Sequence, residues 1–154
     1  MEPTAPAVRR VNILVVEDDA GIAELLRSVF DDILGWETMI VGDAETALSL
    51  LSHAPMDVLL VDVNLPGMKG TDLLATVHLR QGGRQPTAIL MSTDAHVSHV
   101  QAALISGAAR DFVAKPFDLD LLIDVLTRAV SETDSAPDDT EESTAVSAGL
   151  PCAA

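Results

Sequence analysis

Five short apolar runs alternate with segments of helical apolar spacing between residues 11 and 131. The runs span residues 11–16, 36–41, 57–62, 87–92 and 110–114. Such runs, nearly all apolar and rich in β-branched residues, are typical of strands buried on both faces of a sheet. Parallel strands of this kind need crossover connections, which are right-handed. The sequence therefore predicts an α/β fold with a doubly wound, five-stranded parallel sheet and helices on both of its faces.

The intervening segments carry helix signals. In the first, apolar residues recur every three or four positions from Ile22 to Ile33, which predicts one buried helix face. Asp19 is placed to cap this helix and Gly35 to end it. The other predicted helices run from a cap at Asp43 through residue 51, over 71–79 before two glycines at 82–83, over 96–105 before a glycine at 107, and over 119–130.

Length and composition limit the domain organisation and the classes of function. The 154 residues suit one domain with two tails: a flexible lead at 1–10, a domain at 11–131, and a disordered acidic tail at 132–154 that contains no Lys or Arg. No second domain is expected after residue 131. The net charge of −15 argues against direct nucleic-acid binding. No apolar run reaches the roughly 18 residues of a membrane span. The single cysteine, Cys152, allows no internal disulfide, and we expect a cytoplasmic location.

Polar residues end four of the five predicted strands. Because the carboxyl ends of parallel strands share one sheet edge, ligand sites lie there. These residues are Glu17-Asp18-Asp19, Asp62, Ser92-Thr93-Asp94 and Lys115-Pro116. Clustered carboxylates repel one another unless a cation or proton offsets them, and hard carboxylate oxygens suit Mg²⁺. With a metal, an ammonium and a hydroxyl around it, an aspartate there can act as a nucleophile and form an acyl phosphate.

Four motifs in this order and spacing resemble the receiver domain of two-component response regulators. They are ILVVEDD (13–19), LLVDVNLPGMKG (59–70), ILMSTDA (89–95) and FVAKPF (112–117). The resemblance covers about residues 11–131 and implies a flavodoxin-like (βα)5 fold with strand order 2-1-3-4-5. It also implies a stand-alone phosphorylation switch that receives a phosphoryl group from a histidine kinase or a histidine phosphotransfer protein. Output would pass through contacts with a further, unidentified protein, and a homodimer is possible.

The resemblance also implies roles for individual residues. Asp62 is the expected phosphoacceptor, Thr93 and Lys115 would contact the phosphoryl oxygens, and Thr93 and Phe112 would form the conformational switch. Mg²⁺ would be held by Asp18, by Glu17 through water, and by the Asp62 carboxylate and the backbone carbonyl of Asn64. Motion of the threonine and the aromatic ring would alter the face built by the fourth helix, fifth strand and fifth helix.

Three positions depart from the common pattern of the family. Asp94 follows Thr93 where a small residue is usual, and its carboxylate could narrow the approach to Asp62 and affect the phosphorylation rate. Lys69 replaces a frequent acidic residue, with a change of surface charge only. Phe112 lacks the hydroxyl that a tyrosine would offer to a partner. His96 and His99 are spaced to share a metal, but a solvated helix face is the favoured interpretation.

Each site residue also has an ordinary structural interpretation. The acidic run Glu17-Asp18-Asp19 would cap a helix and interact favourably with its dipole, and Asp62 would form a turn. The Thr93 hydroxyl would hydrogen-bond to the backbone. Lys115 would be a solvated surface charge, and Phe112 would be a core residue.

Three other functions stay open. A degenerate receiver could act as a phosphorylation-independent interaction module, which Asp94 alone favours. An aspartate-nucleophile phosphatase of the haloacid-dehalogenase type would need Asp-x-Asp, whereas the third predicted strand ends in Asp62-Val63-Asn64. A flavin or nucleotide binder would need a glycine-rich phosphate loop, which the sequence lacks.

Overall fold

A computed structural model describes residues 10–80, 85–93 and 98–131. Its centre is one parallel sheet of five strands in the order β2-β1-β3-β4-β5, as predicted. The strands are β1 (Asn12–Val16), β2 (Glu37–Val41), β3 (Val58–Asp62), β4 (Thr87–Ser92) and β5 (Asp111–Ala114). Each strand lies within a residue or two of its predicted bounds. The strand order reverses beside β1, so that the carboxyl ends of β1 and β3 are adjacent.

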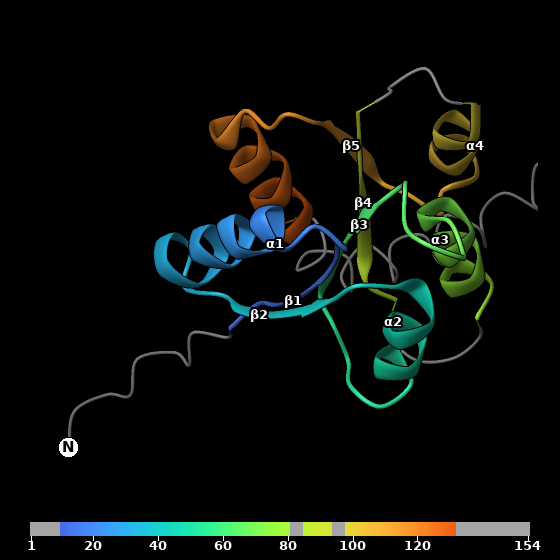
Figure 1. Ribbon diagram of the computed structural model, residues 1–154, viewed down its shortest axis with the longest axis horizontal. Helices are drawn as coiled ribbons and strands as arrows, with labels where there is room; N and C mark the ends of the chain where they lie inside the picture. Colours follow the sequence, from blue (N-terminus) through green and yellow to red (C-terminus); the bar gives the residue numbers. More distant parts are fainter. Residues whose placement is uncertain (1–9, 81–84, 94–97, 132–154) are drawn as a thin grey trace, which may run out of the picture.

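Helices cover both faces of this sheet (Figure 1). They are α1 (Ala20–Arg27), which continues into a π-helical turn η1 (Ser28–Ile33), α2 (Ala44–Leu51), α3 (Gly70–Leu79), α4 (Ser98–Ser106) and a last helix at residues 119–131. In Figure 1, α1 and the last helix, drawn in orange, lie on one side of the sheet, and α2, α3 and α4 lie on the other. The predicted doubly wound arrangement is confirmed.

Two apolar clusters hold the layers together, because alternate strand residues point to opposite faces. One cluster joins Leu14, Leu59 and Leu90 of the sheet to the side of α2, α3 and α4. The other joins Ile13, Leu60 and further strand residues to α1, η1 and the last helix. All five residues of β3 are buried, which explains why this strand reads as a continuous apolar run.

The first predicted helix is partly wrong. Its expected apolar face included Leu25 and Ile33, but their side chains are 45% and 66% exposed. The backbone N–H of Leu34 donates to the carbonyl of Val29 over five residues, so the last turn is wider than an α-turn. The extra residue in this turn rotates Ile33 away from the face set by α-helical spacing. Leu25 lies in α1, before the wider turn, so the turn does not account for its exposure. Gly35, with a φ of 71°, ends the helix as predicted.

Both expected helix caps on aspartates are present. Asp19 accepts a hydrogen bond from the backbone N–H of Ile22 at 3.0 Å, and Asp43 accepts one from Thr46 at 2.7 Å. The predicted start of the fourth helix at His96 and the two glycines after the third helix lie outside the described residues, as do Asp94, residues 1–9 of the predicted lead and the predicted tail at 132–154. In the described part of the chain, none of the helices is long and apolar enough to cross a lipid bilayer.

Candidate functional site

Three acidic residues follow β1 and continue directly into α1. The backbone N–H of Glu17 extends the sheet by donating to the carbonyl of Val41 at 3.0 Å. Asp19 then caps α1, and its own N–H donates to the Glu17 carboxylate at 3.2 Å. The turn thereby points Glu17 inward, where it is only 3% exposed, and leaves Asp18 exposed beside it.

Asp62 is the last residue of β3 and is 5% exposed. The backbone after it is fixed at two points, since Val63 N–H donates to Met91 O at 2.9 Å and Gly70 N–H donates to Val63 O at 3.0 Å. One carboxylate oxygen of Asp62 accepts a hydrogen bond from the backbone N–H of Asn64 at 3.0 Å. The β3–α3 connection therefore orients the Asp62 carboxylate from its own backbone.

Gly70 has a role in the site that the sequence interpretation missed. A Cβ atom at this position would lie directly against the backbone oxygen of Asp62 and 2.8 Å from Val61 Cγ1. Only a residue without a side chain lets α3 begin this close to the end of β3. The available signal was a glycine at the start of a predicted helix, where it serves neither as a turn former nor as a helix end.

Lys115 links the two strand ends. Its backbone N–H donates to Ser92 O at 2.9 Å just beyond β5, before a cis peptide bond to Pro116. Its ammonium group donates to Glu17 Oε2 at 2.8 Å and to Asp62 Oδ2 at 2.9 Å. The Lys115 side chain is 11% exposed, so its ion pairs with Glu17 and Asp62 are largely shielded from water.

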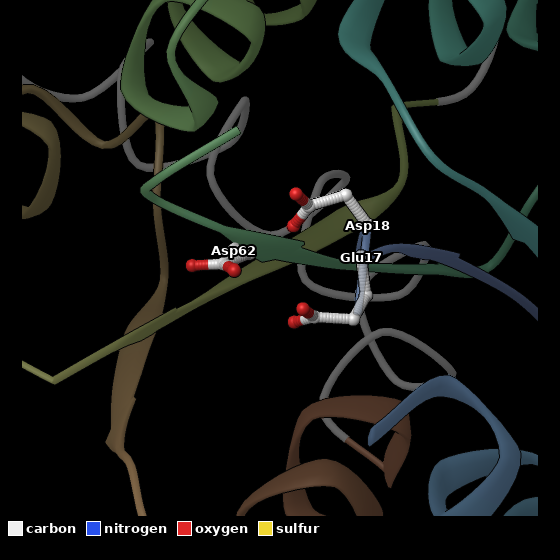
Figure 2. Close-up of side chains that lie close together, drawn as sticks. All are labelled: Glu17, Asp18 and Asp62. Carbon is white, nitrogen blue, oxygen red and sulfur yellow. The ribbon is translucent and has the colours of Figure 1, made fainter. Parts of the chain in front are cut away.

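The carboxylates of Glu17, Asp18 and Asp62 converge on one space, with an oxygen of each within 4.8 Å of the others (Figure 2). Burial raises the pKa of Glu17 above its ordinary value of 4.5, and the charge of Asp62 raises it further, against the lowering effect of Lys115. Burial alone would lower the pKa of Lys115, but its hydrogen bonds to Glu17 and Asp62 outweigh burial and raise it.

This balance of charge fits a divalent cation. The cluster has three carboxylates and a single ammonium, which pairs with Glu17 and Asp62, so negative charge stays in excess where the side chains meet. Oxygen donors with an exposed member, Asp18, suit Mg²⁺, which prefers carboxylates and retained waters. The residues present therefore fit the metal that the sequence analysis expected.

The remaining predicted site residues, Thr93, Asn64 and Phe112, lie outside this cluster of charged side chains. Thr93 follows β4 directly and is exposed at the same sheet edge. Asn64 is exposed two residues after Asp62. Phe112 is half-buried in β5, beside Leu90 of β4, and packs against the cluster that contains α3 and α4. The structure thus brings together Glu17, Asp18, Asp62 and Lys115, whereas Phe112 lies within the sheet, away from the strand ends.

Comparison with known proteins gives one consistent result. A family model described as the response regulator receiver domain matches residues 13–127. Regulatory protein AtoC of Escherichia coli K12 is 36% identical over 118 residues, which cover 77% of this chain and 25% of AtoC. DNA-binding response regulator MtrA of Mycobacterium tuberculosis H37Rv is 31% identical over 128 residues, covering 83% of this chain and 54% of MtrA. The chain thus spans a quarter to about half the length of these relatives.

Solved structures agree with the fold. The signal receiver domain of an HD domain-containing protein from Pseudomonas fluorescens Pf-5 superposes with a TM-score of 0.78 at 27% identity, covering 88% of this chain and 97% of that one. Chemotaxis response regulator CheY4 of Vibrio cholerae gives a TM-score of 0.71 at 25% identity, covering 79% and 99%. The family match, the strand order and the acidic strand ends agree, and the chain belongs to the response regulator receiver domain family.

Proposed function

We propose that this receiver domain is a phosphorylation switch in which Asp62 accepts a phosphoryl group from a histidine kinase or a histidine phosphotransfer protein. The observation that carries the proposal is the convergence of Glu17, Asp18 and Asp62 with the Lys115 ammonium at one sheet edge. A receiver domain is a signalling module rather than a metabolic enzyme, and the reaction serves to change its surface.

In the proposed reaction, a carboxylate oxygen of Asp62 attacks the phosphorus of a phosphohistidine. An O–P bond forms, the N–P bond breaks, and the imidazole leaves with the bonding electron pair and takes up a proton. The product is an acyl phosphate on Asp62. The Asn64 backbone N–H and the Lys115 ammonium already hold the two carboxylate oxygens, so the attacking group is oriented before the phosphodonor arrives.

Charge neutralisation determines whether this transfer proceeds. Asp18, Asp62 and Glu17 would hold Mg²⁺ together with the Asn64 carbonyl, and the metal would offset the charge of the incoming phosphoryl oxygens. Lys115 stays within reach of those oxygens because it is anchored beside Asp62. The hydroxyl of Thr93, at the end of β4, would bond to a third oxygen.

Movement of Thr93 toward the phosphoryl group would change the packing of Phe112 in β5, and with it the face made by α4, β5 and the last helix. A protein partner would read this face. We further propose that the protein acts in the cytoplasm, with residues 11–131 as the signalling domain between the lead at 1–10 and the acidic tail at 132–154, and that it does not bind nucleic acid directly.

Phosphorylation can be tested with a small phosphodonor. The protein is incubated with acetyl phosphate and Mg²⁺, and its intact mass is measured over time. We expect one added phosphoryl group, which is lost when Mg²⁺ is chelated beforehand and is absent from Asp62→Asn. The matched control is Asp72→Asn, which removes an exposed carboxylate from the first turn of α3 and leaves the strand-end site intact.

The other outcomes separate the alternatives. A folded protein that never gains mass would contradict the proposal and favour an interaction module that works without phosphorylation. Continuous release of phosphate without an accumulated adduct would favour a phosphatase. An adduct that persists in Asp62→Asn would place the modification on another side chain and reject Asp62 as the acceptor.

A further inference from the structure

Three adjoining cavities lie at the edge of the sheet opposite to the acidic site, where the strands begin. One, of about 520 Å³, lies between the end of α4, the start of β5 and the last helix, with Leu104, Arg110 and Arg128 among its lining residues. The second, of about 310 Å³, shares Arg110 and adds His78. The third, of about 280 Å³, lies beyond it and contains Arg80 and His53. We call these cavities together the amino-edge groove.

The amino-edge groove is basic although the chain is strongly acidic. The sequence has 24 Asp and Glu against nine Lys and Arg. Three of those arginines and two histidines line the groove, and Asp111 is the one acid among its described lining residues. The Asp111 carboxylate is engaged at 2.7 Å by the backbone N–H of Phe112. Arg128 also pairs with Asp124, one turn earlier in the last helix, at 2.6 Å, so its charge is shared with that carboxylate. Basic side chains are therefore gathered at one end of the molecule and the acidic site occupies the other.

An acidic segment of the same chain begins at the groove. The last helix runs back from the acidic edge, and Arg128 on its final described turn lines the largest cavity. Eleven residues follow residue 131 that contain six carboxylates and no Lys or Arg, namely Glu132, Asp134, Asp138, Asp139, Glu141 and Glu142. We propose that residues 132–142 bind in the amino-edge groove of their own molecule.

Chain length permits this contact. Eleven residues span up to roughly 36 Å when extended, whereas a domain of this size has a radius of gyration of about 14 Å. The segment can therefore pass from Arg128 along the groove as far as Arg80. Each exposed ion pair is weak and screened by salt. A tethered segment has an effective concentration in the millimolar range, so several weak pairs are enough to hold it in place.

Binding in this groove would have a regulatory consequence. The largest cavity belongs to the face of α4, β5 and the last helix, which Figure 1 shows with β5 between the two helices. The acidic segment would compete with any partner that reads this face. This consequence rests on the proposed function, whereas binding of the segment does not.

The test uses the full chain without phosphodonor or Mg²⁺. Because Cys152 is the single cysteine, a Cys152→Ser/Ser143→Cys variant carries one nitroxide label just after the acidic run. Relaxation of backbone amide signals is then measured in isotope-labelled protein. We expect at least twofold stronger broadening at residues 104–110 and 77–80 than at residues 62–67, and loss of that difference in 0.5 M NaCl.

Matched charge variants decide between specific binding and general attraction. Arg110→Gln/Arg128→Gln should abolish the selective broadening, and Arg27→Gln/Lys69→Gln, which removes equal charge outside the groove, should preserve it. Equal broadening at both sheet edges, or broadening that survives Arg110→Gln/Arg128→Gln, would overturn the proposal. A mixture of spin-labelled protein without isotope enrichment and isotope-enriched protein without a spin label, at the same concentration, tests for contacts between copies. Selective broadening in this mixture would also overturn the proposal, because it would assign the contact to a second copy.

Discussion

At the scale of single residues, Lys115 determines how three carboxylates can share one sheet edge. Its ammonium bridges Glu17 and Asp62, and all three side chains are largely removed from water. A single positive charge leaves the cluster with an excess of negative charge, and burial, followed by the charge of Asp62, raises the pKa of Glu17. This excess of negative charge favours the binding of a cation, which would offset the repulsion among the carboxylates.

The raised pKa of Glu17 predicts a pH-dependent effect of Glu17→Gln. A carboxyl group whose pKa is raised by folding binds its proton more tightly in the folded state, so its protonated form favours folding. This stabilisation is complete below the ordinary pKa of 4.5 and is lost as the pH rises through the raised value. In chelator at pH 7.5, Glu17→Gln should therefore melt at a higher temperature than the wild type.

Thermal unfolding at two pH values checks this prediction. The difference between Glu17→Gln and the wild type should shrink as the pH falls through the raised pKa of Glu17 and should be absent below 4.5, because the wild-type side chain is then neutral in both the folded and the unfolded state. Equal melting temperatures at pH 7.5, or a difference that grows in acid, would contradict it.

Gly70→Ala tests whether the close approach of α3 to β3 positions Asp62. The added methyl group would press on the backbone oxygen of Asp62, so we expect a loss of about 1–3 kcal/mol in the free energy of unfolding. Phosphorylation by acetyl phosphate should also slow. Gly42→Ala is the control, since nothing lies within 4 Å of the added Cβ there. Equal effects of the two substitutions on both measurements would reject the positioning role.

Sequence alone identified which residues gather at the site, because parallel strand ends share an edge and each end carried a polar side chain. It did not identify how they pair. That Lys115 contacts both Glu17 and Asp62 depends on distances across three strands, which no local pattern encodes. Phe112 was correctly placed in the fifth strand and Thr93 directly after the fourth, and their roles stay predictions.

At the scale of elements, the helix N-caps were predicted most directly from the sequence. The Asp43 carboxylate accepts the backbone N–H of Thr46, and this hydrogen bond is the main reason that the pKa of Asp43 is lowered from 3.8. A lowered pKa contributes stability above the ordinary value, and that stability is lost as the pH falls through the lowered one.

Asp43 substitutions should separate the cap from its charge. Asp43→Ala should lower the melting temperature at pH 7, with a smaller effect at pH 2. Asp43→Asn should keep most of the stability at pH 7, since the amide oxygen also accepts the hydrogen bond. Circular dichroism melts at the two pH values measure both effects. A loss for Asp43→Asn as large as that for Asp43→Ala would show that charge, rather than the capping hydrogen bond, stabilises α2.

The π-helical turn η1 marks the limit of helical pattern recognition. Apolar residues from Ile22 to Ile33 fit one α-helical face, yet the wider turn leaves Ile33 exposed and lets Trp36 stack on Phe30 with ring centroids 5.8 Å apart. A prediction from apolar spacing assumes that every turn of the helix contains the same number of residues. The choice of a π turn depends on how the chain must return to β2, which is a tertiary constraint.

At the scale of the whole molecule, charge is divided between the two edges of the sheet. Carboxylates meet where β1 and β3 end, and arginines and histidines line the groove where the strands begin. The sequence revealed the total charge of −15 but not this polarity, because residues such as Arg80, Arg110 and Arg128 are far apart in the chain. The fold places them together since α3, the entry to β5 and the last helix all reach the same edge.

The acidic edge predicts that Mg²⁺ stabilises the whole fold. A ligand that binds only the native state raises the free energy of unfolding by about 1.4 kcal/mol at ten times its dissociation constant. Millimolar MgCl₂ should therefore raise the melting temperature, measured against NaCl of equal ionic strength so that screening of the net charge is excluded. Asp18→Ala should remove this shift. Asp32→Ala, which deletes an exposed carboxylate from η1, should retain it. An equal rise of the melting temperature in both variants would mean that Mg²⁺ acts through diffuse charge. It would reject the proposed binding of Mg²⁺ by Glu17, Asp18 and Asp62.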